Sequence, residues 1–122
     1  MAEYLQMTNY SLKEFLIISS CVAFIPAFCE EVLFGGYLMQ NIGSKNSKTY
    51  AIIISAVIFS AIHLVPAAFL TIFVLGYFLG KLFYASNSII PAIILHFLNN
   101  FVIFLAFNYY PDSLLRVEYL AL

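Results

Sequence analysis

The sequence predicts an all-α, polytopic membrane protein: a bundle of about four transmembrane helices whose first helix is long and kinked at Pro26. Hydrophobic residues make up 64% of the 122 residues, well above the roughly 45–50% of an ordinary soluble domain. Charged residues make up only 9%, and the mean hydropathy is +0.99. We therefore expect an integral membrane protein with a single membrane domain over residues 1–122.

Within this domain we expect a lead-in over residues 1–10, a transmembrane core over 11–109 and a short tail over 110–122 that forms an interfacial helix. The lead-in carries one charge, Glu3, and a long apolar run follows it, which is not the pattern of a cleaved signal peptide. We expect the first helix to stay in the mature protein.

The first helix is predicted from Leu12 to about Asn41. Ser11 and Glu14 have the spacing of a capping box, in which two side chains bond the free backbone donors of a helix start. A helix of this length would measure about 45 Å, longer than the roughly 30 Å apolar slab, so it must tilt, kink or protrude. Pro26 supplies the kink because a proline inside a helix removes a backbone hydrogen bond.

Polar residues and prolines separate the remaining helices. The segment Asn41–Thr49 is a polar loop, and Ser88 is the expected N-cap of the last helix. Gly76 and Gly80 form a small-x-x-x-small pair that allows another helix to approach closely. The predicted helices are 50–64, 67–84 and 89–108.

Charge excludes one class of partner and favours one orientation. The net charge of −1 leaves no basic surface for nucleic acid. Lys45, Lys48 and Lys81 lie at one membrane face, whereas Lys13 and Arg116 lie at the other, and this bias weakly favours the first face as cytoplasmic.

The central polar feature is Glu30–Glu31, a pair of adjacent carboxylates inside an apolar run. A charged side chain at membrane depth costs at least about 2.5 kcal/mol, so it indicates a functional site. At ~1.5 Å per residue from the same membrane face, Glu30 and Asn100 both lie ~16 Å deep. His63 then lies ~20 Å deep and His96 ~10 Å deep. Three helices therefore bring polar groups to one layer.

Each group also has a simpler interpretation. A single intramembrane histidine such as His63 is often only a hydrogen-bond partner between helices. One of two adjacent amides must face elsewhere, and we expect this to be Asn99, acting in packing. Glu31 has a structural interpretation, as a carboxylate held neutral or paired. Glu30 is harder to explain in this way.

Three motifs, Glu30–Phe34, Phe59–His63 and His96–Asn100, resemble those of the CPBP family, which comprises CAAX proteases and bacteriocin-processing or immunity proteins and is also called Abi. Their order and spacing fit over residues 28–100. The resemblance implies a polytopic intramembrane endopeptidase in a bacterial cell membrane, with its site facing the cytoplasm. It implies a peptide or protein substrate, lipidated in the branch that cleaves prenylated CAAX proteins.

By position, the resemblance makes Glu30 the general base that activates water and His63 the residue that positions this water. His96 and Asn100 would donate hydrogen bonds to the oxyanion, with Glu31 in support. Whether a metal takes part is open at this point. Glu30, His63 and His96 could in principle form a three-ligand zinc site, and a metal-independent glutamate mechanism is equally open.

Two departures from the family favour an alternative. Gly35 stands where the first motif has an arginine, and family members usually carry further membrane helices before this motif. The alternative is a weakened or inactive member that acts in bacteriocin immunity or as a membrane scaffold, with an oligomer or an additional membrane subunit as partner. A proton or ion pathway is a weaker rival, because four helices hold too few further polar groups to line a path.

Overall fold

The structure is a computed structural model that describes residues 10–109. All of its regular elements over this range are helices, as predicted. The predicted tail helix, Arg116 and all but the last residue of the lead-in lie outside the described residues.

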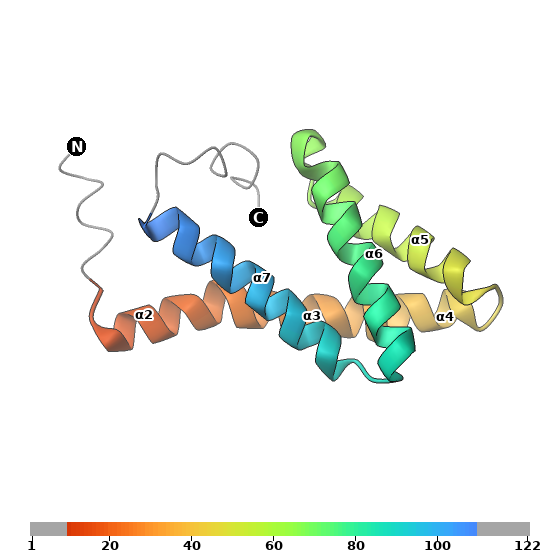
Figure 1. The fold of residues 1–122 in the computed structure, drawn as a ribbon, viewed down its shortest axis with the longest axis horizontal. Helices are drawn as coiled ribbons and strands as arrows, with labels where there is room; N and C mark the ends of the chain where they lie inside the picture. The colour runs from red at the N-terminus through yellow and green to blue at the C-terminus, as the bar shows by residue number, and fades with distance from the viewer. Residues whose placement is uncertain (1–9, 110–122) are drawn as a thin grey trace.

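The first helical stretch is continuous and runs along the longest axis of the molecule (Figure 1). Its Ser11–Glu14 capping box is confirmed: the Glu14 backbone N–H donates to Ser11 Oγ, and the Ser11 backbone N–H donates to a Glu14 carboxylate oxygen. The stretch ends at Gly43, close to the predicted end. Its segments are α2 (Leu12–Ser19), the π-helix η2 (Ser20–Phe24), α3 (Ile25–Glu31), the π-helix η3 (Val32–Met39) and α4 (Gln40–Gly43).

Pro26 is accommodated by a wider helical turn. It is the second residue of α3, directly after η2, and the backbone N–H of Ile25 donates to the carbonyl of Ser20, five residues back. A π turn of this kind leaves room beside the proline ring, which has no N–H to donate. At Pro26, where a kink was expected, the helix contains a π-helical segment.

Four further elements complete the fold, within about two residues of the predicted bounds. Ser47 caps the second helix through a hydrogen bond from the Tyr50 N–H, which explains why this helix begins before Tyr50. Ser88 Oγ accepts from the Ile90 N–H, as an N-cap does. The elements are α5 (Lys48–Ile62), the 3-10 turn η4 (Pro66–Ala68), α6 (Phe69–Ser86) and α7 (Ile90–Tyr109).

Within residues 10–109, the stretches Leu12–Gly43, Pro66–Ser86 and Ile90–Asn108 are long and apolar enough to cross a membrane. The α5 helix is also apolar but has only 15 residues, about 22 Å at 1.5 Å per residue. The chain is therefore an integral membrane protein, and its residues 10–109 form four helical stretches, one of which is shorter than a usual span.

Packing divides the long helical stretch into two halves. The α7 helix packs against η2 and α3, whereas α5 packs against η3 and α4 (Figure 1). The α5 and α6 helices lie side by side, and a Cβ on Gly76 or Gly80 would stand 3.1 Å from atoms of Phe59 or Ile52 on α5. The predicted close approach at the two glycines is confirmed. The boundary between the halves is Glu31, the last residue of α3.

Candidate active site

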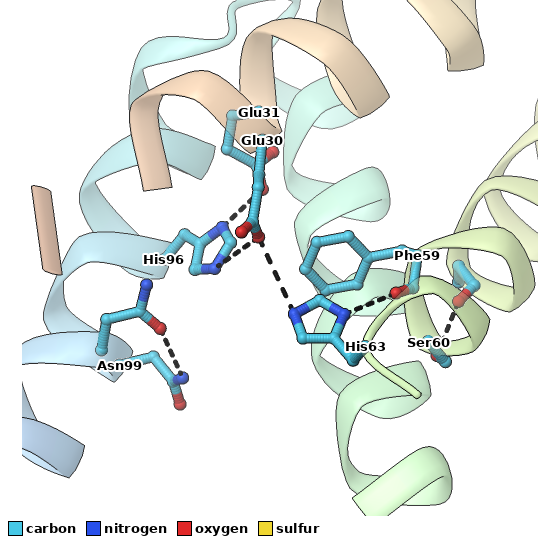
Figure 2. A network of polar contacts seen from close by, with 9 residues as sticks. Glu30, Glu31, Phe59, Ser60, His63, His96 and Asn99 are labelled. Atoms are coloured by element: carbon cyan, nitrogen blue, oxygen red, sulfur yellow. Dashed lines mark hydrogen bonds and ion pairs between the residues drawn. The ribbon is translucent and has the colours of Figure 1, made fainter. Parts of the chain in front are cut away.

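Three helices bring Glu30, His63 and His96 together where the two halves meet. Glu30 belongs to α3, His63 directly follows α5, and His96 belongs to α7. Figure 2 shows the Glu30 carboxylate between the two imidazole rings. Glu30 Oε2 lies 3.6 Å from His96 Nε2 and 4.0 Å from His63 Nε2. The structure thus brings both histidines singled out from the sequence to one carboxylate oxygen of Glu30.

The second glutamate has a different partner. Glu31 Oε1 lies 2.8 Å from His96 Nδ1, and the exposed fractions of the two residues are only 4% and 2%. With Glu31 ionised, the Nδ1–H donates to the carboxylate and fixes the orientation of the ring. Glu31 is therefore paired with a histidine rather than with an arginine, and His96 touches both glutamates through different nitrogens (Figure 2).

His63 is fixed by the backbone of its own helix. Its Nδ1 lies 2.7 Å from the carbonyl oxygen of Phe59. A carbonyl can only accept, so Nδ1 carries the proton, and in the neutral ring Nε2 presents a lone pair toward Glu30. The chain leaves α5 immediately afterwards, and Leu64 takes a left-handed backbone conformation with φ 56°. The bond to Phe59 therefore fixes the His63 ring, and the chain turns away from the helix directly after it.

The ring of Phe59 supports both histidines. Its centroid lies 4.8 Å from that of His63 and 5.7 Å from that of His96, both edge to face, and it packs in the same way on Phe34 at 5.2 Å. In the sequence Phe59 is only the first residue of the motif that ends at His63, and we gave it no role in the site. The i, i+4 spacing from His63 was the available signal.

A pocket of about 320 Å³ opens beside the three residues. Asn100 lines it one helical turn after His96, and Asn99 does not. A smaller pocket on the α6 side is lined by both amides and by the two histidines. The Asn99 amide nitrogen lies 3.5 Å from the Asn100 side-chain oxygen. The rest of the wall of the larger pocket is apolar and consists of Val22, Pro26, Ile103, Phe104 and Phe107.

The three residues that could in principle hold zinc lie somewhat farther apart in this structure than the ligands of a bound zinc ion. Tetrahedral zinc holds its nitrogen and oxygen ligands at about 2.0–2.1 Å, so any two of them lie about 3.4 Å apart. The distances from Glu30 Oε2 to the two imidazole nitrogens are longer, 3.6 and 4.0 Å. No group of three or more His, Cys, Asp or Glu within residues 10–109 is arranged to hold a metal ion. No step proposed below passes through a metal.

Comparison with known proteins gives one match. The model of a family described as Type II CAAX prenyl endopeptidase Rce1-like matches residues 12–102, which is most of the chain and includes Glu30, Glu31, His63, His96 and Asn100. Neither the curated proteins nor the solved structures gave a match.

Proposed function

Because the chain belongs to the Rce1-like family of CAAX-type intramembrane proteases, we propose that it is an endopeptidase in which Glu30 activates a water molecule against a peptide bond. The observation that carries this proposal is the convergence of His63 and His96 on Glu30 Oε2 beside a pocket large enough for a peptide segment. Glu30 Oε2 is itself buried and has no hydrogen-bond partner within the described part of the protein.

The proposed water lies between Glu30 and His63. The 4.0 Å from Glu30 Oε2 to His63 Nε2 is too long for a hydrogen bond, but it suits one water at about 2.8 Å from each atom. Both atoms accept hydrogen, so the two O–H groups of the water point at them and its oxygen lone pairs face the pocket. The oxygen attacks the scissile carbonyl carbon, Glu30 takes the proton, and the same proton passes to the leaving amine.

The oxyanion is proposed to form next to His96 and Asn100. Glu31 and His96 can together carry two protons. One then lies in the 2.8 Å hydrogen bond between His96 Nδ1 and Glu31 Oε1, and the other is bonded to His96 Nε2. Nε2–H then donates to the developing charge, together with the amide of Asn100. Such donors act strongly in a site that excludes water. Glu31 is thus a positioning residue, since it acts through His96.

The substrate is proposed to be a peptide with a large apolar group near the scissile bond. Aliphatic and aromatic side chains make up the pocket wall away from Glu30, including Phe104 and Phe107 on α7. A lipidated C-terminal peptide of the CAAX type, named in the description of the family, meets this requirement. We further propose a bacterial cell membrane as the location, with the site open to the cytoplasm.

The proposal is tested with purified protein reconstituted in lipid vesicles and a farnesylated CAAX peptide labelled at both ends. Cleavage is expected from the natural protein and not from Glu30→Ala or His63→Ala. Cleavage that survives Glu30→Ala overturns the mechanism. The same peptide without its lipid tests whether the apolar pocket selects the lipid group.

A second candidate is a non-proteolytic role in bacteriocin immunity or as a scaffold. The observation that favours it is Gly35, which leaves a small cavity beside Glu31 where the family motif has an arginine. This role does not need the water-activating carboxylate. Protection of cells that persists in Glu30→Ala would support it, whereas loss of protection in that variant would favour the protease.

A further inference from the structure

A second and smaller cavity lies behind the candidate active site. Its volume is about 20 Å³, and it is lined by Glu31 at the end of α3 and by residues of η3, α5 and α6. It shares none of its lining residues with the 320 Å³ pocket beside Glu30. Three of its lining residues are glycines, Gly35, Gly76 and Gly80, whose missing side chains leave the space.

Two polar side chains line this cavity. Glu31 uses Oε1 to bond His96, and its other oxygen, Oε2, lies 3.4 Å from the position that a Cβ on Gly35 would take. Ser55 is 6% exposed, and its Oγ has no hydrogen-bond partner among residues 10–109. Ser60, one and a half turns along the same helix, instead bonds the carbonyl of Ala56 at 2.7 Å. The Ser55 hydroxyl therefore needs a partner that its own helix does not supply.

We propose that this cavity binds one water molecule, which bridges Glu31 Oε2 and Ser55 Oγ. To hold a water, a cavity needs a volume of roughly 10–15 Å³ that a water-sized sphere can occupy, and at least two polar partners. The space of about 20 Å³ meets the size requirement for a water. An unbonded hydroxyl at this depth would carry its full desolvation cost, which the water removes.

The water makes Ser55 a positioning residue. It links Ser55 to Glu31, and Glu31 holds the Nδ1 side of His96. Binding of the water does not depend on the proposed protease function, whereas any effect on cleavage does. The experiments below therefore use no cleavage assay, so that failure of the water site and failure of the proposed function can be told apart.

The direct test is water-to-protein magnetisation transfer by NMR in lipid nanodiscs, read at the Gly35 amide. We expect a cross-peak from a long-lived water in the natural protein. Gly35→Ala should remove it, because the added methyl group fits at 3.4 Å from Glu31 Oε2 and occupies the cavity. The matched control is Gly36→Ala, whose Cβ would face Ile89 instead and should keep the cross-peak. Absence of the cross-peak in the natural protein overturns the proposal.

A second test uses Ser55→Ala and reads the melting temperature and the His96 imidazole nitrogen shifts. If the water is bound, we expect the variant to melt at a lower temperature than the natural protein, with the His96 Nδ1 shift moved and the His63 shifts unchanged; Ser60→Ala, which removes a bonded hydroxyl on the same helix, is the comparison. If the Ser55 hydroxyl has no partner, its removal leaves the melting temperature unchanged or raises it. That result, or an unmoved His96 shift, contradicts the proposed bridge.

Discussion

His96 Nδ1 lies 2.8 Å from Glu31 Oε1, and both side chains are buried. This bond joins the end of α3 to the middle of α7 across 65 residues of sequence. It also answers the question that Gly35 raises, because Glu31 has a partner without the arginine of the family motif. The other nitrogen of the same imidazole, Nε2, lies 3.6 Å from Glu30 Oε2. One histidine thus connects the structural carboxylate to the proposed catalytic one.

Two replacements of Glu31, by Gln and by Ala, test the role of its charge and the role of its hydrogen bond to His96 separately. Glu31→Gln keeps an acceptor for His96 Nδ1, so we expect near-natural thermal stability. Its neutral amide cannot share a proton with the ring, and peptide cleavage should fall about 10- to 100-fold, as when a group that orients a functional histidine is lost. Glu31→Ala should also cost about 1–3 kcal/mol of stability, because a buried donor is left unpaired. Melting curves and cleavage rates measure the two effects, and equal cleavage by the Gln variant and the natural protein would contradict the role given to Glu31.

Replacement of the two adjacent amides, Asn99 and Asn100, should give different results. Asn100 lines the pocket beside Glu30, and Asn100→Ala should lower the cleavage rate about 10²–10³-fold by removing an oxyanion donor. Asn99 does not line this pocket, although it shares a small neighbouring pocket with His63 and His96, so Asn99→Ala is the matched comparison and should change the rate less. A larger loss in Asn99→Ala than in Asn100→Ala would reverse the assignment.

Installing the family arginine should not increase activity. Glu31 already accepts a hydrogen bond from His96, and the space of about 20 Å³ beside Gly35 has no room for a guanidinium group. We expect Gly35→Arg to cleave no faster than the natural protein and to lose about 1–3 kcal/mol of stability by overpacking. Gly35→Met, of similar length and without charge, separates volume from charge. A strong gain in cleavage in Gly35→Arg alone would show instead that the natural protein is a weakened enzyme.

The close approach of α5 and α6 makes Gly76 sensitive to added volume. A Cβ there would stand 3.1 Å from the Phe59 ring and 3.4 Å from the Ala56 backbone, which cannot move aside easily. Gly76→Leu should cost about 1–3 kcal/mol and lower the melting temperature in nanodiscs. Cleavage should fall too, because Phe59 holds His63 in place. Phe78→Leu, at a position on the same helix that is 58% exposed, is the control. Equal melting of both variants would contradict this packing.

The helices could be predicted from the sequence because each boundary has a local physical cause. Ser11, Glu14 and Ser88 act as caps through short-range bonds, and all three were predicted. The π-helical turns around Pro26 were not predicted, because a proline inside a helix can be accommodated by a kink or by an extra residue in the turn before it, and the sequence does not choose between them. Helix α5 begins two residues early because Ser47 caps it, a signal that the apolar run beginning at Tyr50 obscured.

The candidate site could be predicted in part. Depth along each helix was enough to expect Glu30, His63 and His96 in one layer, and the structure brings them together. The pairing of Glu31 with His96 could not be predicted, since it depends on how α3 and α7 are rotated about their axes. The same holds for Ser55, whose hydroxyl reaches the cavity only because α5 packs beside η3.

The most direct test of the central claim is the single-turnover cleavage rate of a farnesylated CAAX peptide by Glu30→Gln in lipid vesicles. The amide keeps the shape of the side chain but cannot take a proton from water. We expect the rate to fall about 10²–10⁴-fold, with the melting temperature within a few degrees of that of the natural protein. A folded Glu30→Gln protein that cleaves at the natural rate would contradict the proposal that Glu30 activates the attacking water.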